Sequence, residues 1–280
     1  MRCIETPVRA DPRVDARPAT FQDTFFSEGV SYGDGKTKDH WVDPGDLVPS
    51  GHGLLLDLGC GGGTTKKKFE AKGYRWIGLD IVNETDPTVV GDAHRLPFQN
   101  ESFAVIYSSQ VFEHLPEPHR AVEEVARVLK PGGVFCGSVS CLEPFHDSYF
   151  NYTHRGLEIL LRGAGLTPTR IEAGPSGFLV ILHHLVDGGG PQLALPIAKL
   201  TVRPFLGMLQ ALGRLFIVLR YGPRSPQMSK LEAYFRKFPL RFAGHIQFAA
   251  EKRAAGDQRF NPPARFDPRP SAAMSPPARP

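Results

Sequence analysis

The chain has 280 residues, of which 41% are hydrophobic, and a formal net charge of +4 at pH 7. This length and composition allow one good hydrophobic core, so we expect a single domain with appendages. The basic residues are spread along the chain, which excludes the concentrated basic patch of a nucleic-acid-binding protein. No apolar signal core opens the sequence, and its four cysteines have no metal-ligand spacing. We therefore expect a reduced cytoplasmic protein rather than a secreted, disulfide-bonded one.

The first 49 residues fall into two parts. Residues 1–20 mix Pro, Arg, Asp and Ala without periodicity, so we expect a disordered N-terminal arm. Residues 21–49 form a different segment, which we interpret either as packing on the edge of a sheet or as a lid over a ligand site. Its aromatic residues, set among glycines and charges, are Phe21, Phe25, Phe26, Tyr32 and Trp41.

The most informative stretch is the sequence LLLDLGCGGGT at residues 54–64. Its apolar run is short and bounded by turn residues, which predicts a buried strand over residues 53–58. The glycines that follow let the backbone turn sharply and let a ligand lie against the main chain. A helix predicted over residues 66–72 would direct its N-terminal N–H groups and positive dipole end to the same place. A strand, a glycine loop and a helix in this order hold nucleotide-type cofactors at the carboxyl ends of a parallel sheet.

The residues of this loop distinguish between cofactors. The third glycine of the dinucleotide motif G-x-G-x-x-G is absent, and there is no G-x-x-x-x-G-K-[ST] phosphate loop. The Asp57 carboxylate would repel a pyrophosphate but suits an ammonium group. S-adenosylmethionine carries an ammonium and a sulfonium and no phosphate, so the loop favours this cofactor. The string DLGCGGG at residues 57–63 also resembles the first motif of class I S-adenosylmethionine-dependent methyltransferases.

Two further acids follow predicted strands. A second strand over residues 75–79 ends at Asp80, about twenty residues beyond the glycine loop. A carboxylate at this point can accept two hydrogen bonds from a ribose diol, and we favour this role over that of a turn residue. A short third strand over residues 88–91 leads to Asp92, which is placed to accept from an adenine amino group, while Ala93 offers its backbone amide.

The remaining elements continue the alternation of strand and helix. An apolar stripe predicts the helix over residues 117–130. Thr153, a natural N-cap, predicts the start of the helix over residues 155–164. The last strand is expected to be antiparallel, which makes residues 176–240 an insertion before it. The predicted strands cover residues 103–108, 134–140, 168–173 and 244–251, and the predicted helices cover residues 117–130 and 155–164.

Three strings follow the glycine loop in a recognisable order. They are GDAHRLPF at 91–98, EHL at 113–115 and VLKPGGVF at 128–135. With the glycine loop and Asp80, their order and spacing closely resemble the methyltransferase domain often called type 11. This resemblance implies a Rossmann-like α/β fold with a doubly wound seven-stranded sheet whose last strand is antiparallel. The domain would span residues 50–253 and carry a helical insertion between strands six and seven.

The resemblance also implies roles for individual residues. The residues that match Asp57, Gly59 and Gly61 hold the methionine part of S-adenosylmethionine, and the one that matches Asp80 holds its ribose. Those that match Asp92 and Ala93 hold the adenine. Residues 109–114 match the stretch on the methyl-transfer side. The full predicted cofactor site is Asp57, Gly59, Cys60, Gly61, Asp80, Ile81, Asp92, Ala93, Ser109 and Gln110.

Three histidines are candidates for a general base, because a hydroxyl acceptor must lose a proton as the new carbon–oxygen bond forms. His114 follows the fourth strand, and a role as a hydrogen-bonded residue that positions its loop is equally open for it. His146 and His154 lie in residues 143–154, which look like the acceptor-side loop of methyltransferases in bacterial glycan and natural-product pathways. His146 ranks first because aromatic residues flank it and suggest a pocket wall.

No metal site is expected from the histidine spacings. His114 and His119 are separated by two prolines. His183 and His184 are adjacent in an apolar run. Neither pair presents two ligands from one helix face.

The insertion is rich in apolar residues and arginines. Residues 204–221 combine a leucine-rich stripe with Arg214 and Arg220, and Pro204 and the arginines interrupt it too often for a membrane span. Two interpretations stay open. We favour a helical cap that closes the acceptor pocket over an interfacial helix that contacts a membrane. The Pro- and Arg-rich residues 254–280 are expected to form a disordered tail.

Together these features predict an S-adenosylmethionine-dependent methyltransferase that acts on a hydroxyl of a small molecule, sugar or natural product. The alternative enzyme would methylate a lipid-linked or quinone-type acceptor as a peripheral protein at a membrane surface. A third interpretation is a non-catalytic fold relative that binds a partner. The intact Asp57, Asp80 and Asp92 argue against it, because such a scaffold has no need of them. We expect no nucleic-acid partner, and the oligomeric state is left open.

Overall fold

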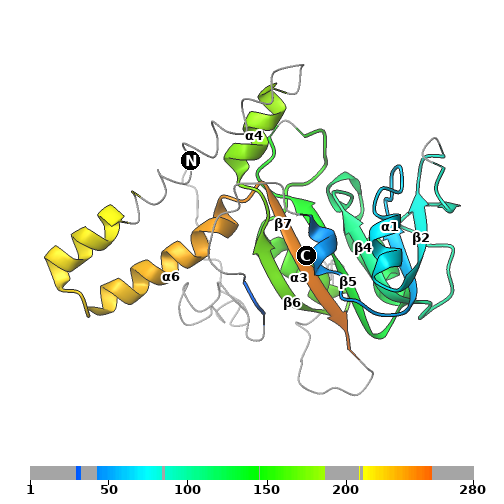
Figure 1. Cartoon of the computed structure of the whole chain (residues 1–280), viewed down its shortest axis with the longest axis horizontal. Coiled ribbons are helices and arrows are strands. Elements are labelled where there is room, and N and C mark those ends of the chain that lie inside the picture. Colours follow the sequence, from blue (N-terminus) through cyan, green and yellow to red (C-terminus); the bar gives the residue numbers. More distant parts are fainter. Residues whose placement is uncertain are drawn as a thin grey trace, which may run out of the picture.

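A computed structural model of the chain describes residues 30–32, 43–83, 86–144, 146–186, 208 and 211–253. Its centre is a seven-stranded sheet in the order β3-β2-β1-β4-β5-β7-β6 (Figure 1). Neighbouring strands among β1 to β5 are parallel, and β7 runs antiparallel to both β5 and β6. This confirms the predicted Rossmann-like α/β fold with an antiparallel last strand. The strands are β1 (Gly53–Leu58), β2 (Tyr74–Asp80), β3 (Val89–Val90), β4 (Phe103–Ser109), β5 (Leu129–Ser140), β6 (Leu166–Ala173) and β7 (His245–Lys252).

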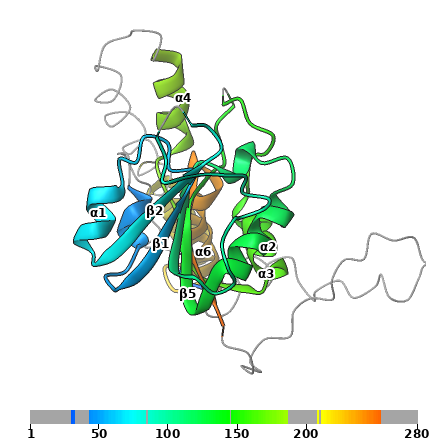
Figure 2. The ribbon, with the colours of Figure 1, turned by 90° about the vertical axis from the view of Figure 1, so that its right-hand side faces the viewer.

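Helices cover both faces of the sheet. Figure 2 shows α1 (Lys66–Ala71) on one face and α2 (Pro118–Val128) with α3 (His154–Gly163) on the other. The short 3-10 helix η1 (Pro44–Leu47) leads to Val48, which packs in the same apolar cluster as Phe69 of α1. The predicted stripe of α2 is fully buried, so its amphipathic pattern fixes which side meets the sheet. The buried stripe consists of Ala121, Val122, Val125 and Val128.

Strand β5 begins at Leu129 rather than at residue 134 as predicted. Leu129 pairs with Phe103 of β4, but the next pairing joins Val105 to Val134, so the chain between them bulges from the ladder. Pro131 lies in this bulge, where a residue without an N–H is tolerated because no ladder hydrogen bond is required. The chain therefore passes from α2 into β5 without a separate loop.

The chain between β6 and β7 confirms the predicted helical insertion. It contains α4 (Gly177–Val186), a helix over residues 211–221 and α6 (Pro226–Arg241). A Cβ on Gly177 would overlap the side chain of Leu142, so α4 starts at the edge of the sheet where β5 ends. In Figure 1, α6 and the helix over 211–221 extend away from the sheet on the side of β6.

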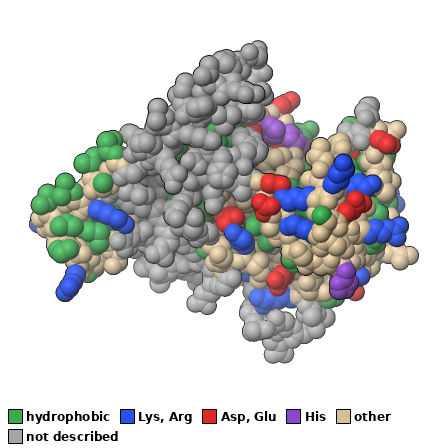
Figure 3. Space-filling model, in the orientation of Figure 1, with side chains coloured by type: hydrophobic (Ala, Val, Ile, Leu, Met, Phe, Trp, Pro, Cys, Tyr) green, Lys and Arg blue, Asp and Glu red, His purple; other side chains and the backbone are tan. Residues whose placement is uncertain are grey.

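The helix over residues 211–221 leaves most of its apolar side chains exposed. Figure 3 shows hydrophobic side chains together with Lys or Arg side chains on this projecting part. An apolar stripe of this kind was expected to pack as a cap, so its exposure is a difference from the favoured interpretation. Among the described helices, none has the length and apolar character needed to cross a membrane. The exposed side chains are Leu212, Leu215, Phe216, Val218, Leu219 and Tyr221.

The described part of the N-terminal segment packs on the edge of the sheet. The Ser31 N–H donates to the Thr169 carbonyl at 2.9 Å, and the Ile171 N–H donates to the Ser31 carbonyl at 2.8 Å. Residues 30–32 thus extend the sheet beyond β6, as one of the two interpretations expected. The aromatic residues on which the lid interpretation depends, except Tyr32, lie outside the described residues, as do the arm at 1–20 and the tail at 254–280.

A close approach of β4 and β5 predicts the effect of one substitution. A Cβ at Gly137 would overlap the backbone carbonyl of Ser108, and backbone cannot move aside as a flexible side chain can. Gly137→Ala should lower the free energy of unfolding by more than about 3 kcal/mol, beyond ordinary overpacking, in urea denaturation. Gly163→Ala is the matched control, because a Cβ there meets open space, and it should cost nothing. Equal midpoints for the two variants would contradict the register of β4 and β5.

Candidate functional site

The glycine loop lies where β1 ends and is held against the end of β2. The N–H groups of Gly59 and Cys60 both donate to the Leu79 carbonyl, at 2.8 and 3.1 Å. Gly59 has φ = +74°, and a Cβ there would overlap the side chain of Val111. Glycine is therefore required at this position both for its backbone conformation and for the close approach.

Asp80 ties the glycine loop to β2. Its Oδ2 accepts from the Gly61 N–H at 2.8 Å, and its Oδ1 accepts from the Val82 N–H at 3.2 Å. A carboxylate has about four acceptor positions, so both oxygens can accept further hydrogen bonds. The side chain of the adjacent Ile81 is 71% exposed. An acid and an exposed apolar side chain thus lie together at the rim, which suits a ligand with a polar sugar and a flat ring.

Asp57 lies beneath the loop rather than on its surface. Its side chain is buried, and its Oδ2 accepts hydrogen bonds from the Thr65 hydroxyl and, at 3.1 Å, from the Trp76 indole N–H. Burial raises the pKa of this carboxyl group, and the nearby Asp80 acts in the same direction. These contacts join β1, β2 and the start of α1. Direct contact of Asp57 with a cofactor ammonium group stays a prediction.

Burial also affects the thiol in this loop. It raises the pKa of Cys60 to about 11, with Asp57 and Asp80 adding to the shift. The Cys60 sulfur lies 3.6 Å from the Gly61 carbonyl oxygen. The thiol therefore stays protonated near neutral pH and contributes shape rather than charge.

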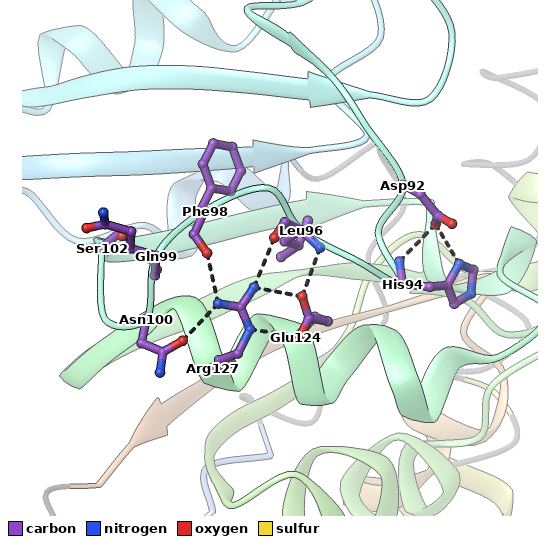
Figure 4. Close-up of polar contacts among 9 residues, drawn as sticks. All are labelled: Asp92, His94, Leu96, Phe98, Gln99, Asn100, Ser102, Glu124 and Arg127. Carbon is purple, nitrogen blue, oxygen red and sulfur yellow. Dashed lines mark hydrogen bonds and ion pairs between the residues drawn. The ribbon is translucent and has the colours of Figure 1, made fainter.

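The loop after β3 presents the next predicted residues (Figure 4). The exposed Asp92 accepts from the His94 N–H at 2.9 Å and contacts the His94 Nδ1 at 2.6 Å. These hydrogen bonds lower the pKa of Asp92, the backbone one most. Ala93 is buried between them. An ionised, exposed carboxylate beside a buried small residue can accept from a ligand amino group.

Arg127 of α2 holds this loop in place. Its guanidinium donates to the carbonyls of Leu96 and Phe98 at 2.9 and 2.8 Å, and to the Asn100 Oδ1 at 2.9 Å (Figure 4). Glu124 binds the same guanidinium and accepts from the Leu96 N–H at 2.8 Å. This role was not predicted from the sequence. The apolar stripe indicates the buried side of α2, whereas Arg127 and Glu124 lie outside that stripe.

The chain after β4 is strained where it enters the site. Gln110 has φ = +56°, a conformation that non-glycine residues adopt rarely. Its N–H donates to the Ser138 carbonyl at 3.0 Å, and its Nε2 donates to the Ser138 hydroxyl at 3.1 Å. The Ser109 hydroxyl contacts the same Ser138 hydroxyl at 2.9 Å. Strand β5 thus holds both predicted residues in position.

Two of the three candidate histidines meet in space. His114 belongs to the 3-10 helix η2 (Phe112–His114) after β4, and His146 lies on the loop after β5. Their Nε2 atoms are 2.9 Å apart, and their ring centroids are 4.6 Å apart. The same loop is fastened to η2, because the N–H groups of Tyr149 and Phe150 donate to the Glu113 carbonyl at 2.8 and 3.2 Å. Both aromatic side chains are exposed beside the pair.

Glu113 is the acid of this cluster, and the sequence analysis gave it no role of its own. Its side chain is fully buried. Its Oε1 accepts from the Ser140 N–H at 3.2 Å, whereas its Oε2 is buried without a hydrogen-bond partner. Burial raises the pKa of Glu113 to about 7, and Glu143 adds to this shift. The signal that could have found it is the acid directly before His114 in the string EHL.

His154 does not join this cluster. It is the first residue of α3, and its side chain is buried. The preceding Thr153 caps the helix as predicted, because its hydroxyl accepts from the Gly156 N–H at 3.1 Å. The structure thus brings His114 and His146 together with Glu113 at the carboxyl ends of β4 and β5, and leaves His154 in the packing of α3.

Known proteins resemble this chain most clearly over the glycine loop and the strands around it. Residues 56–137 match a family model described as "Methyltransferase domain". Over 129 residues the chain is 33% identical to an uncharacterized methyltransferase of Mycobacterium leprae, a match that covers 39% of this chain and 48% of the relative. Over 168 residues it is 33% identical to an uncharacterized methyltransferase of Mycolicibacterium vanbaalenii, with 51% and 64% covered. The chain therefore spans between about half and just under two thirds of these curated relatives.

A solved structure with a similar chain path is that of a putative methyltransferase from Bacillus halodurans. It is 17% identical to this chain, the TM-score is 0.47, and the match covers 75% of this chain and 96% of the other. The matched family model covers β1 to the middle of β5, residues 56–137 of the chain.

The contacts of Arg127 predict its effect on stability. Arg127→Met leaves two loop carbonyls and the half-buried Glu124 without their donor, so the free energy of unfolding should fall by about 2 kcal/mol. Amide hydrogen exchange at Leu96 should also become faster. Arg120→Met, on the same helix, removes one exposed ion pair with Glu117 and should change stability by less than about 0.5 kcal/mol. A loss of equal size in both variants would refute the anchoring role of Arg127.

Proposed function

Residues 56–137 belong to the methyltransferase domain family known as type 11, and from this premise we propose that the protein methylates a hydroxyl group of a small molecule. The methyl donor would be S-adenosylmethionine, and the acceptor a sugar or a hydroxylated natural product. The observation that carries the proposal is the bond from the Gly61 N–H to Asp80, which joins the glycine loop to the acid at the end of β2.

The residues at the rim suit the parts of this cofactor. The glycine loop would lie against its methionine part, where the absence of side chains at Gly59 and Gly61 lets the backbone come close. Asp80 would accept from the ribose hydroxyls and Ile81 would pack on the adenine. Asp92 would accept from the adenine amino group. When bound, the cofactor supplies an electrophilic methyl group on a sulfonium.

The acceptor proton has a receiving group in the same place. As the oxygen–methyl bond forms and the methyl–sulfur bond breaks, the electron pair stays on sulfur and the hydroxyl proton must leave. We assign this proton to the His114–His146 pair, whose Nε2 atoms are in hydrogen-bond contact. His146 would act first because Tyr149 and Phe150 lie exposed on the same loop and can contact the acceptor. His154 is the weaker candidate, because it is buried at the start of α3.

The role of Asp80 can be tested by calorimetric titration with S-adenosylmethionine and, separately, with NAD. Asp80→Asn replaces one acceptor oxygen by a donor amide, so the affinity for S-adenosylmethionine should fall at least about tenfold, the loss expected for a hydrogen bond to a charged group. Asp86→Asn removes the same charge at an exposed residue whose φ of +51° asparagine tolerates, and it should bind normally.

Circular dichroism of each variant separates loss of binding from loss of fold. Normal binding by Asp80→Asn would refute the assignment of β2 to the cofactor site. A folded wild-type protein that binds neither ligand would move the weight to the non-catalytic interpretation.

A second candidate function follows from the helix over residues 211–221. Its exposed apolar side chains, with Arg214 and Arg220 among them, favour an acceptor that is lipid-linked or quinone-like and reached at a membrane surface. This helix would then contact the membrane interface instead of capping the pocket. The small-molecule proposal does not require this exposed surface.

Vesicle co-sedimentation distinguishes the two acceptors. The protein should bind phosphatidylcholine vesicles that contain phosphatidylglycerol, and Phe216→Glu with Leu219→Glu should abolish this binding, because two charges would enter the apolar interface. Ser229→Glu, an exposed residue of α6, is the matched control and should bind as the wild type does. Absence of wild-type binding, or binding that survives the double substitution, would exclude this helix as a membrane contact.

A further inference from the structure

We propose that Glu113, His114 and His146 bind a divalent transition-metal cation at the acceptor side of the site. Each residue offers one ligand atom, and these atoms all lie within 4.8 Å of one another. The three residues come from η2 and from the loop after β5, so the chain brings them together only in the folded state. The role of the ion in methyl transfer rests on the proposed function, whereas its binding does not.

The spacing of the imidazoles is close to that required by a common ion. Their Nε2 atoms are 2.9 Å apart. Two nitrogen ligands about 2.1 Å from a tetrahedral Zn²⁺ lie about 3.4 Å apart, so the two rings would have to separate by about 0.5 Å to coordinate one ion. The observed distance is also that of a direct hydrogen bond between the rings, so the decision depends on the third ligand.

A hydrogen bond between the two histidines would not explain the environment of the Glu113 carboxylate. Its side chain is fully buried, and its Oε2 has no hydrogen-bond partner although Ser140 satisfies Oε1. A buried acceptor without a donor destabilises the fold. Buried carboxylates are normally paired or coordinate a metal. A cation bound by both imidazoles would also bring a positive charge to the Glu113 carboxylate, which has an oxygen within reach of both rings.

A second carboxylate lies behind one of the ligands. The Nδ1 of His146 is 3.9 Å from the Oε1 of Glu143, and the Oε2 of Glu143 contacts the Nε2 of the buried His245 at 3.1 Å. Histidines that bind metals usually direct their second ring nitrogen to a carboxylate, which fixes the tautomer and leaves the other nitrogen free to coordinate. At 3.9 Å Glu143 lies beyond hydrogen-bond distance of this nitrogen, so the ring or the carboxylate would have to move closer for Glu143 to take this role.

The donor set indicates which cations would bind. Two imidazoles and one carboxylate suit Zn²⁺, Co²⁺ or Mn²⁺, whereas Mg²⁺ and Ca²⁺ prefer oxygen ligands throughout. Three protein ligands leave at least one position for an oxygen of the acceptor. His114 is exposed and the His146 side chain is 24% exposed, so an acceptor can reach the site from solvent. Figure 3, in the orientation of Figure 1, shows histidine side chains at the surface near α4.

This site would change how the acceptor loses its proton. A cation lowers the pKa of a hydroxyl that coordinates it, so the proton can leave to solvent without a free imidazole as base. The two histidines would then act as ligands while the ion is present. An acceptor hydroxyl whose oxygen takes the open coordination position would be activated in this way.

Equilibrium dialysis of the full chain, free of any histidine tag and treated with a chelator, tests the proposal with Zn²⁺ as the probe. We expect one equivalent to bind. His146→Asn and Glu113→Gln should each weaken this binding at least about tenfold, since each removes a ligand. Glu113→Gln also removes a buried charge, so it should remain folded. His119→Asn, an exposed histidine of α2 outside the cluster, is the matched control and should bind as the wild type does.

Co²⁺ provides a second readout, because its visible absorption bands report coordination by the protein. Bands that appear in the wild type and in His119→Asn but not in His146→Asn support the site. Absence of stoichiometric binding, or binding that all variants retain, overturns it. Titration with S-adenosylmethionine is measured on the same samples. Zinc binding without cofactor binding would refute the proposed function and support the metal site. Cofactor binding without zinc binding would refute the metal site and support the proposed function.

Discussion

The parallel order of β3, β2, β1, β4 and β5 brings the carboxyl ends of five strands to one edge of the sheet. The candidate site depends on this constraint, because its residues lie at the ends of these strands or on the segments that follow them. The close contact of Gly137 with Ser108 keeps β4 and β5 in register. Asp80 and Gly61 then join the ends of β1 and β2. Open α/β sheets bind ligands at such an edge because the polar groups of several loops converge there.

Two acids at this edge are buried, and burial raises the pKa of both. Asp57 is held by Thr65 and Trp76, and Glu113 accepts one hydrogen bond from Ser140. A buried carboxylate is stabilised in its ionised form by a nearby positive charge. A cofactor with an ammonium and a sulfonium would provide such a charge on the side of Asp57, and a divalent cation would provide it at Glu113. The same electrostatic requirement therefore links the two proposals, although they concern different loops.

Elements with strong local signals were predicted well. The glycine loop, the acid at Asp80 and the apolar stripe of α2 each follow from short-range chemistry, namely backbone freedom, strand length and helical periodicity. The start of β5 was misplaced, because a bulge opposite Phe103 allows Pro131 and Gly132 to lie within the strand's span. For the helix over residues 211–221 the sequence left a cap and an interfacial helix open, since an apolar stripe does not indicate which surface will cover it.

The doubly wound sheet and the glycine turn after β1 could be predicted from the residues alone. Which side chains lie together could not. His114 and His146 are 32 positions apart, and no periodicity relates them. Glu113 has a buried oxygen without a hydrogen-bond partner only when β5 lies beside β4 in the sheet. Arg127 makes its three contacts with the loop only when α2 has packed on the sheet. Local sequence encodes backbone preference and polarity, whereas contacts between distant residues are set by strand order and register, which arise from the packing of the whole sheet.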